Sequence, residues 1–143
     1  MRTPLILLAA LLLPGSALAE DREINGLTGP AAPQGFTLRD LNVIDLGKEF
    51  PEGGTLGFRT RYVTLAPGGI VPIHSHEGRP ALTYIISGEA IEHRSDTDGP
   101  IVRRAGEVTM DVGGIAQWWE NAGDVPVVML VGDVFDQGQA ADH

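Results

Sequence analysis

The chain has no cysteine among its 143 residues, so neither a disulfide nor a thiolate metal ligand is available to it. Basic residues are also scarce: 10 Lys and Arg stand against 19 Asp and Glu, for a formal net charge of −9. An acidic surface repels phosphate backbones and has no attraction for anionic lipid, so we expect neither nucleic acid nor a membrane as a partner. Without cross-links, the fold must depend on its core.

Long hydrophobic runs are missing as well. The longest apolar stretch, residues 5–13, is too short to span a bilayer comfortably. Arg2 precedes it, and Ala17-Leu18-Ala19 follows it as a small-x-small cleavage site. We therefore predict that residues 1–19 are a signal peptide and that the protein is periplasmic or secreted. The alternative is a short membrane anchor.

The remaining length suits one domain with one core. Residues 20–36 are polar and rich in Gly and Pro, which indicates an N-terminal arm without regular structure. Residues 37–135 form the predicted domain. Residues 136–143 are predicted to be a flexible C-terminal tail, so we expect terminal His143 to be solvated rather than functional.

The body of the domain alternates short β-like runs with turn signals rich in Gly and Pro. Predicted strands cover residues 58–65, 70–76, 81–86, 89–94, 101–104, 108–112, 117–120 and 125–135. Residues 38–46 fit either a strand or one or two helical turns. Because 19 glycines and 10 prolines exclude a helical bundle, the pattern predicts an all-β sandwich or barrel.

Two histidines, His74 and His76, stand one residue apart within a predicted strand, and they are two of only four in the chain. Residues i and i+2 of a strand point to the same face. Two inward imidazoles fill a core at high cost unless something binds them, and a metal ion is the obvious candidate. The alternative is a metal-free pocket in which the rings bond to each other or to buried acids.

The spacing around this pair resembles the two motifs of the cupin superfamily. The first resembling run is Gly68-x5-His74-x-His76-x4-Ala81-x6-Gly88. The second is Gly106-x5-Val112-x-Gly114-x2-Gln117-x3-Asn121. Seven of the ten defining positions match without a change in spacing. The resemblance implies a single cupin jelly-roll domain, also described as a double-stranded β-helix barrel.

Two departures from the family pattern fall on the metal ligands. Cupins typically hold their metal with both histidines and the Glu of the first motif and the His of the second; here Ala81 replaces the Glu and Gln117 replaces the His. The resemblance implies a divalent ion (Fe, Mn, Ni, Cu or Zn) on His74, His76 and Gln117. Binding should be weak, because an amide oxygen is a poorer donor than imidazole and no anionic ligand remains.

A substitute carboxylate is a further hypothesis. If Ser87-Gly88 forms a two-residue hairpin loop, Thr83 pairs with Glu92. This pairing points Glu92 inward, where it could replace the lost ligand, and His93 outward. A slip of one residue in register would reverse both assignments.

Two more side chains are candidates for contact with a substrate. Arg79 lies at the start of a strand, where it could clamp a carboxylate or form an ordinary salt bridge at the rim. Trp119 shares the face of Gln117, so it belongs either to a cavity wall or to the core, while Trp118 takes the opposite face. No residue is assigned a catalytic role.

The function that these features favour is an exported, metal-dependent enzyme, oxygenase-like or isomerase-like, acting on a small oxygenated molecule. A cupin that binds a small molecule without catalysis is the alternative, because the loss of two ligands also fits relaxed demand for chemistry. A structural subunit with a vestigial pocket is a third reading. The resemblance further implies a homodimer, with Tyr84 and the N-terminal arm as candidate contacts.

Overall fold

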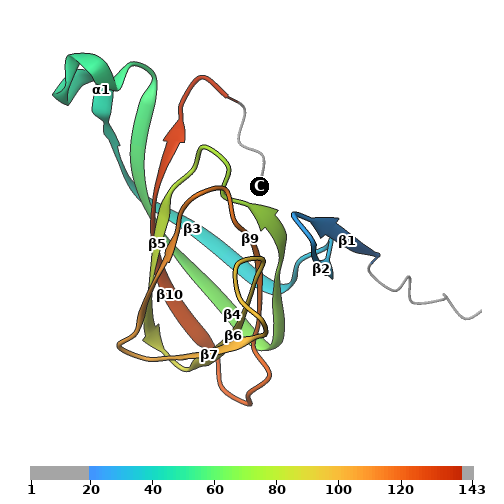
Figure 1. Ribbon diagram of the computed structural model, residues 1–143. Helices are drawn as coiled ribbons and strands as arrows, with labels where there is room; N and C mark the ends of the chain where they lie inside the picture. Colours follow the sequence, from blue (N-terminus) through green and yellow to red (C-terminus); the bar gives the residue numbers. More distant parts are fainter. Residues whose placement is uncertain (1–19, 140–143) are drawn as a thin grey trace, which may run out of the picture.

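The computed structural model describes residues 20–139, and it confirms the all-β prediction (Figure 1). The predicted signal peptide and the last four residues lie outside this range. The strands are β1 (Asp21–Ile24), β2 (Leu27–Pro30), β3 (Gln34–Asp45), β4 (Leu56–Ser75), β5 (Ala81–Ser87), β6 (Glu89–Arg94), β7 (Ile101–Arg104), β8 (Val108–Asp111), β9 (Ala116–Glu120) and β10 (Val127–Asp136). Two short helical segments, α1 (Leu46–Glu49) and a 3₁₀ turn (Pro51–Gly53), separate β3 from β4.

The sheet curls into two facing layers that enclose the core, as in a jelly roll. Hydrogen-bonded neighbours follow the order β7-β6-β9-β4-β10-β5-β8, and β3 adds to β4. Every pairing in the sheet is antiparallel. No helix within residues 20–139 has the length and hydrophobicity needed to cross a membrane.

The prediction of an irregular N-terminal arm was wrong. Residues 21–30 form the β1–β2 hairpin, whose turn residues Asn25 and Gly26 both have positive φ, at 52° and 77°. An Asn-Gly pair of this kind is the favoured sequence for a tight two-residue hairpin turn. The hairpin is attached to the barrel, because Arg22 Nη2 donates to the Ile73 carbonyl oxygen at 2.8 Å.

Strand β4 is one continuous element where the sequence predicted two. Its first half pairs with β3 and β10, and its second half pairs with β9. The bend between the halves falls at Pro67-Gly68-Gly69, where Gly68 has φ +73° and a Cβ on Gly69 would stand 2.7 Å from the Ala66 carbonyl oxygen. The bend moves β4 from one layer to the other and carries His74 to a position beside β9.

The predicted β5–β6 hairpin is also wrong. Strand β5 pairs with β10 and β8, whereas β6 pairs with β7 and β9. The chain therefore crosses between layers at Gly88, which has φ +81° and whose Cβ would meet the Pro126 carbonyl oxygen at 2.8 Å. The inward and outward assignments survive, since each strand keeps its own alternation of faces.

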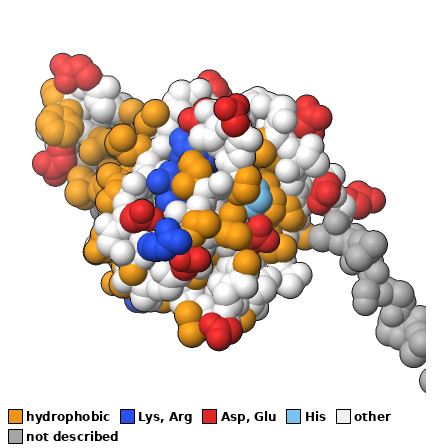
Figure 2. Space-filling view, turned by 60° about the horizontal axis from the view of Figure 1, so that its bottom comes forward, with side chains coloured by type: hydrophobic (Ala, Val, Ile, Leu, Met, Phe, Trp, Pro, Cys, Tyr) orange, Lys and Arg blue, Asp and Glu red, His pale blue; other side chains and the backbone are white. Residues whose placement is uncertain are grey.

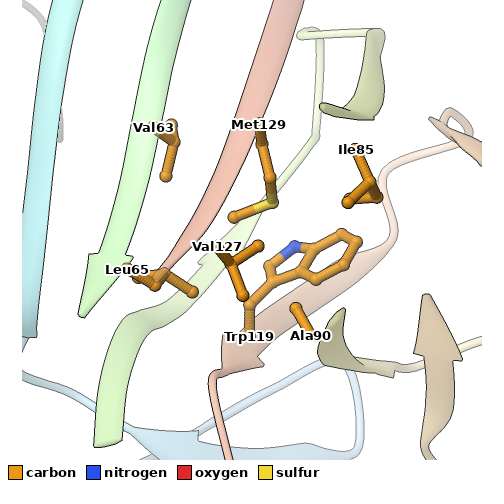
Figure 3. Packing of buried hydrophobic residues seen from close by; sticks show 7 residues of the cluster. All are labelled: Val63, Leu65, Ile85, Ala90, Trp119, Val127 and Met129. Carbon is orange, nitrogen blue, oxygen red and sulfur yellow. The ribbon is translucent and has the colours of Figure 1, made fainter. Parts of the chain in front are cut away.

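The hydrophobic core lies between the layers (Figure 3). Its cluster of buried side chains comes from both layers: Val63, Leu65, Ile85, Ala90, Trp119, Val127 and Met129. Each of the larger aliphatic side chains contributes about 1.5–3 kcal/mol by leaving water. Trp119 is 3% exposed and points into this cluster, so it is part of the core, and it also borders the cavity described below.

The end of β3, α1 and the start of β4 form a projection beside the barrel (Figure 1). Residues 38–46 are thus strand as far as Asp45, whose side chain caps α1 by accepting from the Lys48 amide at 3.2 Å. Hydrophobic side chains gather on this projection (Figure 2), among them the exposed Val43, Ile44 and Phe50.

Candidate metal centre and ligand pocket

His74 and His76 face each other where β4 ends. Their Nε2 atoms are 3.1 Å apart, and each Nδ1 lies 2.9 Å from a backbone carbonyl oxygen, that of Pro72 for His74 and that of Arg79 for His76. A carbonyl oxygen only accepts, so Nδ1 carries the proton in each neutral ring and Nε2 keeps its lone pair. Both lone pairs therefore meet at one place.

The neutral state of His74 follows from its surroundings. Burial is the main cause that lowers its pKa to about 4, and His76 and Arg79 act in the same direction, while the hydrogen bond to Pro72 opposes them. Near neutral pH the ring is uncharged and free to act as a ligand.

We expect this lowered pKa to make the metal-free protein less stable in mild acid. The unfolded chain takes up a proton on His74 near its ordinary pKa of about 6.5, whereas the folded chain resists protonation until about pH 4. The free energy of unfolding should therefore fall between these limits, by up to about 3 kcal/mol. Urea titrations of the chelator-treated wild type and of His74→Gln give the free energy of unfolding at each pH. The difference between the two pH profiles measures the contribution of His74, and identical profiles would contradict the prediction.

Gln117 adjoins the pair from β9, where it is the register partner of His74. Its Nε2 lies 2.9 Å from His76 Nε2 and 3.1 Å from Asp111 Oδ2. A carboxylate can only accept, so Asp111 fixes the amide with its nitrogen toward β8. The amide oxygen Oε1 is then buried with no hydrogen-bond partner in the part of the chain that the structure describes.

Asp111 is the functional candidate that the sequence analysis missed. It is the register partner of Ala81, the position of the lost Glu, and its Oδ2 lies 3.9 Å from His76 Nε2. The carboxylate of Asp111 on β8 thus lies beside the methyl group of Ala81 on β5. Burial is the largest cause of its raised pKa. No signal in the sequence indicated Asp111: residues 108–111 alternate apolar and polar side chains, yet it is the polar pair, Thr109 and Asp111, that points inward.

Glu92 points inward, as predicted, but it does not line the pocket. Its Oε1 accepts from Arg94 Nη1 at 2.8 Å and from Thr109 Oγ1 at 3.1 Å, and its Oε2 accepts from Arg103 Nε at 2.7 Å. Both oxygens are occupied, so Asp111 rather than Glu92 is the buried carboxylate at the imidazole pair.

His93 points away from the barrel interior, as predicted. Its ring stacks on Trp118, with centroids 3.6 Å apart and planes 4° from parallel. Its Nε2 lies 2.9 Å from Glu120 Oε1. Trp118 also packs against β2, because a Cβ on Gly29 would overlap its indole ring. This group holds the N-terminal hairpin and has no part in the pocket.

An arginine cluster forms the other polar wall. Asp133, 1% exposed, accepts from Arg59 Nε at 2.9 Å and Nη2 at 3.0 Å, and Arg61 and Arg79 each place an Nη2 at 3.4 Å from its Oδ2. Arg79 therefore forms an ion pair with a buried carboxylate at the pocket. Sequence reasoning missed Arg61 and Asp133, since only the β4–β10 register brings them together.

One open cavity unites these groups, with a volume of about 510 Å³ that includes its mouth. It is lined by Leu38, Arg61, Val63, Val71, His74, His76, Arg79, Thr83, Gln117, Trp119, Met129, Val131 and Asp133. Of the six predicted site residues, five line this cavity, and Glu92 is the exception.

The donor set fits a weak site for a divalent ion. Two ligands in neighbouring positions at about 2.1 Å from one ion stand about 3 Å apart, close to the 3.1 Å between the two Nε2 atoms. Gln117 would supply a third donor only after its amide turned, because in this arrangement its nitrogen, and not its oxygen, lies 2.9 Å from His76 Nε2. Within residues 20–139, no three His, Cys, Asp or Glu side chains are grouped closely enough to hold a metal without such help.

The sequence profile of the cupin domain matches residues 61–132, half of the chain, which includes both histidines, Asp111 and Gln117. The chain is a cupin. A germin-like protein of Arabidopsis thaliana (subfamily T member 2) is 31% identical to this cupin over 121 residues, 80% of this chain and 53% of the relative. The oxalate-binding protein of Thermotoga maritima is 36% identical over 66 residues, 46% of this chain and 53% of that protein.

Among solved structures, the Bacillus subtilis oxalate decarboxylase with Mn(II) centres matches this cupin with a TM-score of 0.53 and 25% identity. The match covers 76% of this chain and 27% of the decarboxylase. This cupin spans about half the length, or less, of the curated relatives reported first. The match to the cupin profile establishes the family, and the structural match agrees with the fold.

Proposed function

We propose that this cupin holds a divalent metal ion on His74, His76 and Gln117 and uses it to bind a small oxygenated molecule in the adjoining cavity. The observation that carries the proposal is the pair of Nε2 lone pairs 3.1 Å apart, each aligned by a backbone carbonyl oxygen behind the ring. Such outer hydrogen bonds orient metal-binding histidines in general. The Mn(II) centres of the related decarboxylase support the same choice of group.

The finer proposal is an enzyme, oxygenase-like or isomerase-like. A bound metal would supply Lewis acidity or oxygen activation. The chain itself contributes Arg79 and the neighbouring arginines to orient an acidic group. Trp119 and the aliphatic side chains around it exclude water from one end of the cavity.

A cupin that binds without catalysis is the second candidate. One observation favours it: the only carboxylate beside the imidazole pair among the described residues, Asp111, also pairs with Arg94 at 2.9 Å. Because Arg94 offsets the negative charge of Asp111, the centre has less anionic character than a site with a free Glu. Such a site is better suited to binding a ligand than to catalysing redox chemistry.

Metal loading tests the proposal. Untagged protein, refolded and dialysed separately against Fe(II), Mn(II) and Zn(II), should retain close to one equivalent of at least one metal by elemental analysis. Retention below about a tenth of an equivalent of all three would end the metal proposal, leaving the fold untouched. A chelator that removes the metal should also abolish stabilisation by small oxygenated ligands. Ligands that still raise the melting temperature without metal would favour the binding module.

A homodimer and export remain proposals too. Leu82, Tyr84, Val108 and Met110 are exposed on the outer face of the paired strands β5 and β8. Apolar side chains in register on one sheet face suit burial by another protein surface. Light scattering of the protein expressed without residues 1–19 would measure the oligomeric state, and a monomer would contradict the dimer.

A further inference from the structure

The side-chain amide nitrogen of Gln117 lies at the ring nitrogen that an ion would have to bind. It is 2.9 Å from His76 Nε2 and 3.1 Å from Asp111 Oδ2. His76 Nδ1 carries the ring proton toward the Arg79 carbonyl oxygen, so Nε2 has a lone pair and no proton. One N–H of Gln117 therefore donates to that lone pair and the other donates to Asp111. The electron pair that a metal ion needs is already in a hydrogen bond.

The orientation of this amide is set at its nitrogen end. Turning the amide by half a rotation would bring Oε1 into the place of the nitrogen. The oxygen would then face the lone pair of His76 and a carboxylate oxygen of Asp111, neither of which can donate a hydrogen bond. No partner holds the other end, because Oε1 is buried without a hydrogen bond among residues 20–139. An acceptor thus stays unpaired while the nitrogen keeps both of its contacts.

Asp111 is itself held in place from its other side. Its side chain is fully buried, and its Oδ1 accepts from Arg94 Nη1 at 2.9 Å. Arg94 also donates to Glu92 at 2.8 Å, and to the two oxygens of Asp96 at 2.8 and 3.1 Å. A carboxylate anchored in this way has little freedom to move aside when the amide turns. Repulsion between the two oxygens therefore opposes the turned amide.

We infer that Asp111 is a positioning residue that keeps the metal site closed by holding the Gln117 amide with its nitrogen toward His76. This inference rests on the proposed function and concerns the regulation of that same site. An ion on His74, His76 and Gln117 needs the amide oxygen, so it must first break the hydrogen bonds of the amide nitrogen. Asp111 thus lowers the affinity for metal, although its negative charge by itself would attract a cation.

Asp111→Asn separates these two effects, because they have opposite signs. Arg94 only donates, so it attracts the oxygen of the new side chain and leaves the new nitrogen toward Gln117. That nitrogen donates to Oε1, and the turned amide then offers its oxygen to an ion. The affinity for Zn(II), measured by competition with a chromophoric chelator, should rise about 10-fold or more, the value of one hydrogen bond to a charged group. Loss of negative charge alone would lower the affinity instead.

Asp96→Asn is the matched control, because Asp96 also pairs with Arg94 but does not line the cavity, and its side chain is 47% exposed. Its affinity for Zn(II) should equal that of wild type. In a Gln117→Met background, which has no amide to turn, Asp111→Asn should no longer raise the affinity. A rise that persists in this background would overturn the inference. Weaker binding by Asp111→Asn alone would also overturn it, since Asp111 would then be a ligand.

Proton–nitrogen NMR of the wild type gives a readout that needs no variant to fold. Both side-chain amide protons of Gln117 should move upfield when Zn(II) is added, as protons do on losing a hydrogen bond. Asn121, whose amide donates to backbone carbonyl oxygens, is the internal reference and should not move. Binding of Zn(II) that leaves the signals of Gln117 in place would overturn the inference.

Failure of this inference and failure of the proposed function give different results. Uptake of Zn(II) by wild type with no gain in Asp111→Asn refutes the role of Asp111 and leaves the metal function standing. Uptake by Asp111→Asn alone supports the closing of the site by the amide and refutes metal binding by the natural chain. Uptake by neither protein refutes both.

Discussion

Replacing Arg94 with alanine is expected to lower the free energy of unfolding by about 3–5 kcal/mol, which is the usual cost of stripping a buried charge of its partner. Arg94 Nη1 donates to Glu92 Oε1 at 2.8 Å, to Asp111 Oδ1 at 2.9 Å and to Thr109 Oγ1 at 3.0 Å. Both carboxylates are fully buried. Without the guanidinium, two negative charges would face each other inside the barrel or one would have to take up a proton.

Chemical denaturation of Arg94→Ala and Arg103→Ala measures this effect. Among the carboxylates of the cluster, Arg103 contacts only Glu92. The side chain of Arg103 is 22% exposed. Its loss leaves Glu92 paired with Arg94 and open to some water, so a smaller cost, about 1–2 kcal/mol, is expected. A free energy of unfolding for Arg94→Ala within about 1 kcal/mol of wild type would show that the cluster relaxes easily, against the usual behaviour of buried ion pairs.

Replacing His74 and His76 together with alanine should weaken metal binding by at least about 100-fold, because loss of even an outer partner of a ligand costs 10–100-fold. Both rings border the open cavity, so water can enter the space that they leave. The double variant should therefore remain a folded barrel.

Competition of each variant with a chromophoric chelator gives the metal affinity, and circular dichroism on heating reports the fold. His93→Ala is the matched control, because His93 stacks on Trp118 outside the cavity. Its affinity for metal should equal that of wild type. Unchanged affinity in the double variant would place the metal elsewhere, and loss of its thermal transition would show that the histidines are structural.

Much of the fold was predictable because strand patterns are local. The expected runs at 89–94 and 101–104 coincide with β6 and β7, and the run at 81–86 falls one residue short of β5. The facing of Glu92 and His93 was correct even though the hairpin used to argue it does not exist. Alternation along a single strand decides which side chains point inward, whatever the partner strand is.

The two errors within the domain share one cause: each concerned a long-range pairing or the path between layers. The bend at residues 67–69 and the crossing at Gly88 send strands into opposite layers, and the sequence alone shows only that a turn occurs there. The Asn-Gly pair at residues 25–26 was a local signal for the N-terminal hairpin, but the high content of Gly and Pro around it obscured the pattern.

The sequence by itself determined the family, the inward facing of Glu92 and the histidine pair, since these follow from spacing and from the two-residue period of a strand. Tertiary structure alone decided which charges meet. Asp111 reaches the imidazole pair because β8 pairs with β5, and Asp133 gathers three arginines because β10 lies beside β4 and close to Arg79. Register between distant strands depends on the packing of the whole barrel, and no short stretch of residues encodes it.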